Sequence, residues 1–70
     1  MEFHDKIKKL RNDLKLTQPQ VADYIGITYQ NYQLIEYGKS KPSFDTLIKL
    51  CKCLNASADY LLGLKENNGR

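Results

Sequence analysis

The chain has only one histidine, His4, and this shortage narrows the chemistry that it can perform. A single histidine provides no second pair of zinc ligands and no Ser-His-Asp or Cys-His arrangement for nucleophilic catalysis. We interpret His4 and the neighbouring Asp5 as a frayed pair near the terminus. No glycine-rich phosphate loop is present, and 70 residues leave no room for a substantial pocket. The sequence therefore predicts neither an enzyme nor a bound metal or cofactor.

Cysteine is also scarce, since the chain has only Cys51 and Cys53. They lie two residues apart within a helical pattern, where side chains at this spacing do not face each other. A disulfide between them is therefore not expected, because bridged cysteines must bring their Cβ atoms together. We expect both to be small buried side chains, and a metal site is the remote alternative.

Long apolar runs and strand-like alternation are missing as well. No stretch approaches the ~20 apolar residues that cross a membrane, and residues 1–5 do not resemble a signal peptide. The hydrophobic fraction of 41% and the charged fraction of 27% are ordinary for a globular domain and wrong for a disordered chain. We therefore expect one cytosolic domain, close to the smallest size at which a hydrophobic core holds a fold unaided.

The charge that is present is mildly basic. Eleven Lys and Arg residues against eight Asp and Glu residues give a net charge of +3, a weak bias toward anionic partners. Residues 39–52 contain a single acid, Asp45, and four lysines: Lys39, Lys41, Lys49 and Lys52. A solvated helix face is the commoner explanation of such a cluster, and an anion-binding surface is the alternative.

Helix-start and helix-stop residues divide the chain into five short segments, for which we predict helices over roughly 3–14, 18–25, 29–37, 44–54 and 58–62. Residues that can cap a helix precede the last four: Thr17, Thr28, Ser43 and Ser57. Residues that favour a left-handed turn follow them: Gly26, Gly38, Asn55 and Gly63. The fold class is thus all-α, a compact five-helix bundle over residues 1–64. Residues 65–70 form a polar tail or the start of a linker.

Apolar residues at helical spacing mark the expected inner faces of three of these helices. In the first helix they are Phe3, Ile7, Leu10 and Leu14. In the second they are Val21, Ala22 and Ile25. In the fourth they are Phe44, Leu47, Ile48, Cys51 and Leu54.

The second and third predicted helices are separated only by residues 25–27, and this turn contains Gly26. So short a turn forces a large crossing angle and describes a helix-turn-helix over about residues 17–37, which displays the third helix at the surface. At ~100° per residue, the inward arc of that helix holds Thr28, Tyr32, Ile35 and Glu36. Its outward arc holds Gln30, Gln33, Leu34 and Tyr37, with Tyr29 at the margin.

The outward arc of the third helix carries amides and an apolar side chain where Lys and Glu would be the usual choice. The DNA major groove accommodates a helix, presents adenine as a donor–acceptor pair that matches a Gln amide, and exposes thymine methyls to apolar contact. The alternative is that Gln30 and Gln33 are only good helix formers and that Leu34 packs on a neighbouring subunit. The turn before this helix leads us to favour docking in the groove.

Residues 16–63 read LTQPQVADYIGITYQNYQLIEYGKSKPSFDTLIKLCKCLNASADYLLG. This stretch resembles the XRE, or lambda-repressor-like, family of bacterial and phage helix-turn-helix regulators, and the resemblance covers roughly Ile7 to Leu64. The motifs that carry it are Thr17-Gln18, Ala22, Gly26, Glu36-x-Gly38 and Pro42-Ser43. The resemblance implies a five-helix bundle that binds operator DNA, commonly as a dimer.

The resemblance also implies roles for single residues. It assigns base reading to Tyr29, Gln30, Gln33 and Leu34. It assigns phosphate contacts to Gln18, Thr28, Lys39 and Lys41. Gln18 would also support the first reading residue. The chain departs from the family at Tyr32, usually a smaller aliphatic residue, and at Tyr29, often a smaller polar or basic one. These departures concern the base preference more than the binding of DNA.

Two charged residues lie on helix faces that are expected to be buried, where a charge loses its hydration. Arg11 lies at the edge of the apolar face of the first helix, and Glu36 lies on the inward arc of the third. An unpaired buried charge is very unfavourable, and many members of the family pair an Arg and a Glu at these positions. We therefore predict a partly buried Arg11–Glu36 salt bridge that holds the third helix against the first.

These patterns together predict a sequence-specific DNA-binding regulator, a repressor that acts as a homodimer on a palindromic operator. The apolar excess of the last helix supplies the expected dimer surface: Tyr60, Leu61, Leu62 and Leu64. The rival is a protein-interaction module of the same fold, such as an antitoxin or adaptor, because five tyrosines in 70 residues suit a protein interface. Salt dependence separates the two, since only phosphate contacts weaken steeply with salt.

Overall fold

A computed structural model describes residues 1–64, and within that range the chain forms five helices and no strand. They are α1 (Phe3–Asp13), α2 (Gln18–Ile25), α3 (Tyr29–Glu36), α4 (Phe44–Leu54) and α5 (Ala58–Leu62). The all-α, five-helix prediction is therefore confirmed. The expected tail, residues 65–70, lies outside the described residues.

Side-chain caps explain where the last four helices begin. The hydroxyl oxygens of Thr17, Thr28, Ser43 and Ser57 each accept the backbone N–H three residues further on. At α2 the Gln20 side chain also accepts the Thr17 backbone N–H, which completes a capping box. Each cap pairs a donor that the helix itself leaves unpaired, so the starts of these helices are where the sequence places them.

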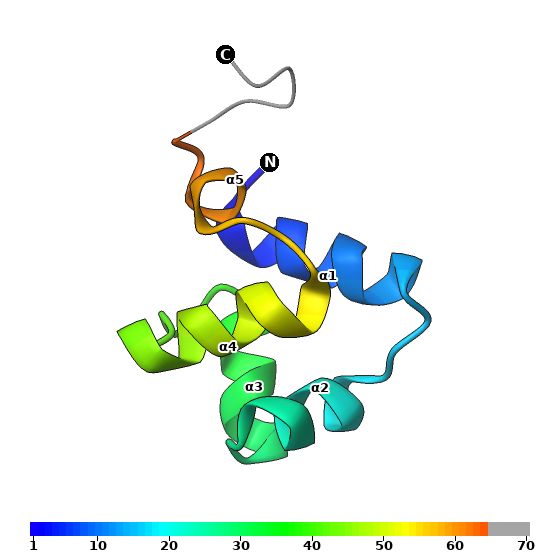
Figure 1. Cartoon of the computed structure of the whole chain (residues 1–70). Coiled ribbons are helices and arrows are strands. Elements are labelled where there is room, and N and C mark those ends of the chain that lie inside the picture. Colours follow the sequence, from blue (N-terminus) through cyan, green and yellow to red (C-terminus); the bar gives the residue numbers. More distant parts are fainter. Residues whose placement is uncertain (65–70) are drawn as a thin grey trace.

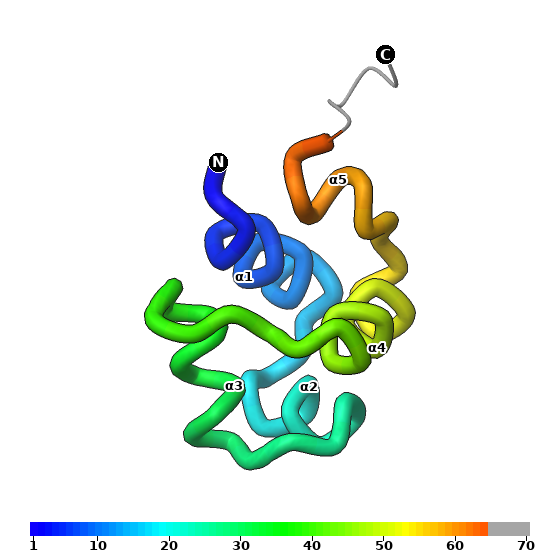
Figure 2. The backbone as a smooth tube through the Cα atoms, turned by 90° about the vertical axis from the view of Figure 1, so that its left-hand side faces the viewer, coloured from blue at the N-terminus to red at the C-terminus, as the bar shows by residue number. Residues whose placement is uncertain are grey.

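The turn between α2 and α3 depends on Gly26. Its φ is +78°, a left-handed conformation that a residue with a Cβ rarely adopts, and its N–H bonds back to the last turn of α2. The chain leaves this turn directly into the Thr28 cap of α3. α2 and α3 lie at one end of the molecule and α5 at the other, with α1 and α4 between them (Figures 1 and 2).

The hydrophobic core draws side chains from all five helices. Its buried members are Ile7, Val21, Ala22, Ile25, Tyr32, Ile35, Leu50, Leu54 and Leu61. The expected inner face of α4 is partly wrong, because Phe44 is 76% exposed and Ile48 is 39% exposed. The inner face instead runs through Leu47, Leu50 and Leu54, one line at helical spacing. Phe44 is the first residue of α4, at the end that extends past the neighbouring helices (Figure 1).

Two further apolar residues differ from expectation. Leu14, expected on the inner face of the first helix, is 46% exposed because α1 ends before it and Leu14 is only the C-cap. Leu61, expected on a dimer surface, is fully buried in the core, whereas Leu62 and Leu64 are exposed. A helix as short as α5 points few side chains toward α1 and α4, and Leu61 takes that place. The assignment of Leu61 to a dimer surface is therefore wrong.

Tyr60 is held from α1 and packs against the core. The Lys6 ammonium donates to the Tyr60 carbonyl oxygen at 2.7 Å and lies 4.8 Å from the centroid of the Tyr60 ring. This arrangement combines a charge-assisted hydrogen bond with a cation–π contact. Tyr60 is half-buried, and its contacts with Lys6 are part of the packing of α5 against α1.

Cys51 and Cys53 are both half-buried free thiols, and burial raises the pKa of each. Among residues 1–64 there is no group of three or more His, Cys, Asp or Glu that could hold a metal ion. None of the helices in this range has the length and apolar character needed to cross a membrane.

Candidate nucleic-acid interface

α3 presents two faces of different character. Tyr32, Ile35 and Glu36 are 0%, 5% and 2% exposed, as expected for the inward arc. On the other face Leu34 is 42% and Tyr29 42% exposed, so the expected outward residues do reach the surface. Four members of the outward set are exposed: Tyr29, Gln30, Leu34 and Tyr37. The fifth, Gln33, is half-buried.

The expectation that Thr28 faces inward is wrong, since Thr28 is exposed. It is the N-cap of α3, with an extended backbone (φ −70°, ψ 154°), so the helical angle of 100° per residue does not apply to it. Its exposure leaves it available for the phosphate contact expected from the sequence.

The inner face of α3 is fixed to α1 by an ion pair. Arg11 Nε donates to Glu36 Oε2 at 2.8 Å, and Arg11 Nη2 donates to Glu36 Oε1 at 2.9 Å. The side chains are 11% and 1% exposed. Arg11 Nη1 also donates to the Leu16 carbonyl oxygen at 2.8 Å, in the connection that leads to α2. The predicted salt bridge is confirmed, and its bidentate geometry fixes the orientation of both side chains.

Two more donors reach the same carboxylate. The Tyr32 hydroxyl donates to Glu36 Oε2 at 2.5 Å, and Gln18 Nε2 donates to Glu36 Oε1 at 2.8 Å. The hydroxyl gives a physical reason for the large aromatic residue at position 32. It brings a donor to the buried carboxylate while its ring, which is fully buried, fills the core. The sequence indicated that Tyr32 was unusual but not that its hydroxyl joins the ion pair.

The charge state of this cluster follows from its hydrogen bonds. Burial alone would raise the pKa of Glu36, but the hydrogen bonds from Arg11, Tyr32 and Gln18 outweigh it and lower the pKa. The hydrogen bond to Glu36 raises the pKa of Arg11. Burial, followed by the hydrogen bond to the carboxylate, raises the pKa of Tyr32. The cluster is therefore an ionised pair with a neutral tyrosine near neutral pH.

Gln18, the first residue of α2, links this buried cluster to the outward face of α3. While its Nε2 bonds to Glu36, its Oε1 lies 3.4 Å from Gln33 Nε2 and 3.5 Å from the Tyr29 hydroxyl. Gln33 Nε2 lies 3.5 Å from the Tyr37 hydroxyl as well. The expected support of Tyr29 by Gln18 is present. The roles of Gln33 and Tyr37 in the same network had no signal in the sequence beyond their shared helix face.

The loop after α3 folds back on that helix through Gly38. Gly38 has a φ of +81°, and a Cβ there would lie 2.8 Å from Nδ1 of His4, so the site admits only glycine without a shift. The backbone N–H of Lys39 then donates to the Leu34 carbonyl oxygen at 2.9 Å. His4 is therefore packed against this loop and is more than the frayed residue expected from its position.

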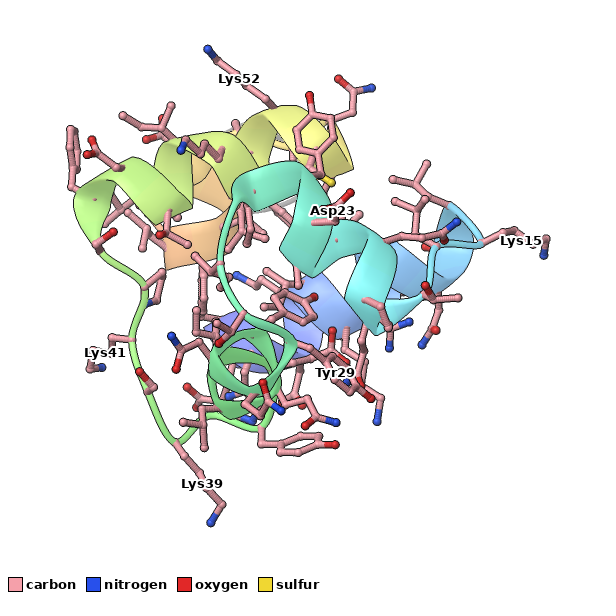
Figure 3. All side chains as sticks on the ribbon, turned by 90° about the horizontal axis from the view of Figure 1, so that it is seen from below. Lys15, Asp23, Tyr29, Lys39, Lys41 and Lys52 are labelled. Atoms are coloured by element: carbon pink, nitrogen blue, oxygen red, sulfur yellow. The ribbon has the colours of Figure 1, made fainter. Side chains whose placement is uncertain are left out.

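Lys39 and Lys41 extend from this loop between α3 and α4, and Lys52 points away on another side (Figure 3). Both loop lysines are exposed. The expected phosphate-contacting residues thus flank α3: Gln18 and Thr28 on the side of α2, and Lys39 and Lys41 on the side of α4. Of these four, Gln18 is in direct contact with two of the expected reading residues, Tyr29 and Gln33.

Comparison with known proteins agrees with this geometry. A family model described as helix-turn-helix matches residues 7–61. The chain belongs to the helix-turn-helix family. Over 65 residues it is 42% identical to the uncharacterized HTH-type transcriptional regulator YqaE of Bacillus subtilis, covering 93% of this chain and 56% of that one. Over 63 residues it is 33% identical to the cryptic phage CTXphi transcriptional repressor RstR of Vibrio cholerae, covering 90% and 56%. The chain thus spans little more than half the length of either relative.

A solved structure shares this fold. The P22 c2 repressor in complex with a synthetic operator superposes with a TM-score of 0.85 at 27% sequence identity. The match covers 89% of this chain and 94% of the other. The similarity confirms the fold and the repressor-like family expected from the sequence.

Proposed function

We propose that the chain binds double-stranded DNA in a sequence-specific manner by placing α3 in the major groove, and that it regulates transcription as a repressor. The observation that carries the proposal is the outward face of α3, with its amides and leucine, on a helix that the buried Arg11–Glu36 pair fixes to α1. The P22 c2 repressor structure with its operator and the repressor RstR support it by similarity.

Within this proposal Tyr29, Gln30, Gln33 and Leu34 read the bases, and Gln18, Thr28, Lys39 and Lys41 contact phosphates. Amides can pair with adenine and Leu34 can contact thymine methyls, whereas a lysine ammonium attracts any phosphate. The chain acts by binding rather than by catalysis, residues 1–64 form the DNA-binding domain, and its place of action is the cytosol, where bacterial DNA lies.

The testing experiment is selection of bound duplexes from a random pool, followed by affinity measurements on the enriched site. Gln30→Ala should cost about 1–3 kcal/mol on that site and little on unrelated DNA. Asn12→Ala, an exposed amide on α1, is the matched control and should change neither. Equal losses on specific and unrelated DNA would contradict a base-reading role.

The loop lysines are tested by salt dependence. Lys39→Ala and Lys41→Ala should each weaken binding to all sequences alike and lower the slope of log K against log salt by about one. Lys52→Ala removes another exposed lysine, which points elsewhere, and should leave the slope unchanged (Figure 3). Equal slopes for all three variants would make Lys39 and Lys41 ordinary surface lysines.

We also propose that two copies bind a palindromic site, with half-site centres about one helical turn apart. A mostly apolar groove lined by Phe3, Lys41, Pro42, Leu47 and Leu62 lies between the start of α4 and the end of α5, and Phe44 and Leu64 are exposed as well. A second copy that covers this surface would remove it from water. Sedimentation should give two protomers per operator, and Leu62→Asp should favour one. A single wild-type protomer per site would refute pairing.

One observation favours a second candidate function, a protein-interaction module. Tyr24 on α2 is 63% exposed and takes no part in the α3 network. A partner protein held by such aromatic contacts would bind with little dependence on salt, in contrast to DNA.

A further inference from the structure

Gln30 and Gln33 carry the same amide on the same helix, but the structure leaves them different atoms to offer a base. Gln33 Nε2 lies 3.4 Å from Gln18 Oε1 and 3.5 Å from the Tyr37 hydroxyl, so both of its N–H groups face acceptors of the protein. Within residues 1–64, Gln33 Oε1 takes part in no hydrogen bond, and the Gln30 side chain takes part in none at all.

The orientation of Gln33 can be traced to the buried carboxylate. Glu36 is ionised and can only accept, so the Gln18 amide must turn its nitrogen toward it, as the 2.8 Å contact shows. The Gln18 oxygen then faces α3 and can be approached only by a donor. Reversing the Gln18 amide would bring two oxygens together beside a buried charge, which is strongly unfavourable.

The same constraint passes to the next amide. If Gln33 were reversed, its oxygen would face Gln18 Oε1, and two acceptors would be in contact without a proton between them. The Tyr29 hydroxyl also directs its proton to Gln18 Oε1, at 3.5 Å. These contacts are longer than the inner ones, but they have the same polarity.

We propose that Gln33 reads DNA through its carbonyl oxygen alone, and that it selects a base with an exocyclic amino group in the major groove, adenine or cytosine. This inference rests on the proposed function. Adenine N6 and cytosine N4 are the major-groove donors, whereas guanine and thymine present only acceptors to such a side chain. Gln30 keeps both its donor and its acceptor and can pair with adenine in the bidentate manner. Gln18 is the positioning residue that transmits the polarity of Glu36 to Gln33.

The test is selection of bound duplexes by wild type and by four variants, with sequencing of the recovered pool. Gln33→Met identifies the position that Gln33 reads, and Gln30→Met identifies a different one as the internal control. At the Gln33 position wild type should recover adenine or cytosine over guanine and thymine. The preference should be roughly 2- to 10-fold, the ratio that one neutral hydrogen bond contributes.

Two variants test the orientation of the Gln33 amide. Gln18→Met removes the acceptor that holds the Gln33 amide, so the amide can rotate and the preference at its position should fall toward one, while that at the Gln30 position persists. Gln33→Glu can only accept, so it should keep adenine or cytosine at that position even if overall affinity drops. Thermal unfolding of each variant shows that the domain remains folded.

The outcomes separate the inference from the proposed function. A wild-type preference for guanine or thymine at the Gln33 position would overturn the inference, as would an unchanged preference in Gln18→Met or no position that depends on Gln33. In each of these cases an enriched operator still supports DNA binding. Recovery of no enriched sequence by wild type would refute the proposed function, and the inference with it.

Discussion

The two ends of the molecule hold their helices in different ways. α3 is fixed by three directional bonds to Glu36 from other helices, two from Arg11 on α1 and one from Gln18 on α2, at 2.8 to 2.9 Å. α5 is held by one fully buried leucine, Leu61, and by the Lys6 ammonium on its backbone. Hydrogen bonds to an ionised group specify orientation, whereas apolar burial depends mainly on area. The contacts at the α2–α3 end therefore fix the orientation of α3, and we call this the directional end. The contacts at the α5 end mainly hold that helix against α1 and α4, and we call this the attached end.

The largest loss of stability is expected when only one partner of the Arg11–Glu36 ion pair is removed. Glu36→Leu leaves the Arg11 charge buried without an opposite charge, and Arg11→Met does the same to Glu36. Each variant should lose about 3–5 kcal/mol of unfolding free energy. The double variant should be much more stable than the sum of the single losses predicts, because an apolar pair replaces the ion pair at little net cost. Thermal unfolding of the four proteins measures this coupling.

The chain offers a matched control for that cycle. Lys9 and Asp13 form an ion pair on α1 at 3.0 Å, with side chains 58% and 57% exposed. Exposed pairs contribute only about 0–1 kcal/mol, so the Lys9→Met and Asp13→Leu cycle should show little coupling. If both cycles give the same small value, the Arg11–Glu36 pair does not hold α3 as described.

At the apolar end, neighbouring leucines should behave differently. Leu61→Ala removes a fully buried side chain and should cost about 2–5 kcal/mol. Leu62→Ala changes a side chain that is 50% exposed and should shift stability by about 0.5 kcal/mol or less. Chemical denaturation of both variants checks the contrast. Similar losses would mean that α5 is turned differently and that Leu61 belongs to the surface after all.

The directional end should also respond to acid. The pKa of Glu36 is lower in the folded chain than its ordinary value of 4.5, so the folded state binds this proton less readily than the unfolded state. Its contribution to stability is therefore complete above about pH 4.5 and is lost as the pH falls through the folded pKa. The advantage of wild type over Glu36→Gln in unfolding free energy should shrink in acid. An advantage that is constant from neutral pH to well below 4.5 would contradict this account.

The same contrast explains which features could be predicted from the sequence. The Arg11–Glu36 pair was predictable because a charge on an apolar face has few alternatives to pairing. The helix starts were predictable because capping depends on residues close together in the chain. Phe44, Ile48 and Leu61 were misassigned because an apolar residue on a short helix can face either way, and only the neighbouring helices decide. The Gln18 link to Gln33 was not predictable, since it needs the actual placement of α2 beside α3.

The smallest loss of stability is expected for a variant at the attached end, and this variant tests whether the two ends open independently. Lys6→Met removes the hydrogen bond to the Tyr60 carbonyl oxygen and the cation over its ring, and should cost about 1 kcal/mol. Because the hydrogen bond and the cation–π contact of Lys6 both go to Tyr60 on α5, hydrogen exchange should quicken in α5 and stay unchanged in α3. Lys8→Met, at an exposed position on the same helix, should alter neither helix. Equal acceleration in α3 and α5 would show that the molecule opens as one unit, and that the difference between its ends lies in geometry alone.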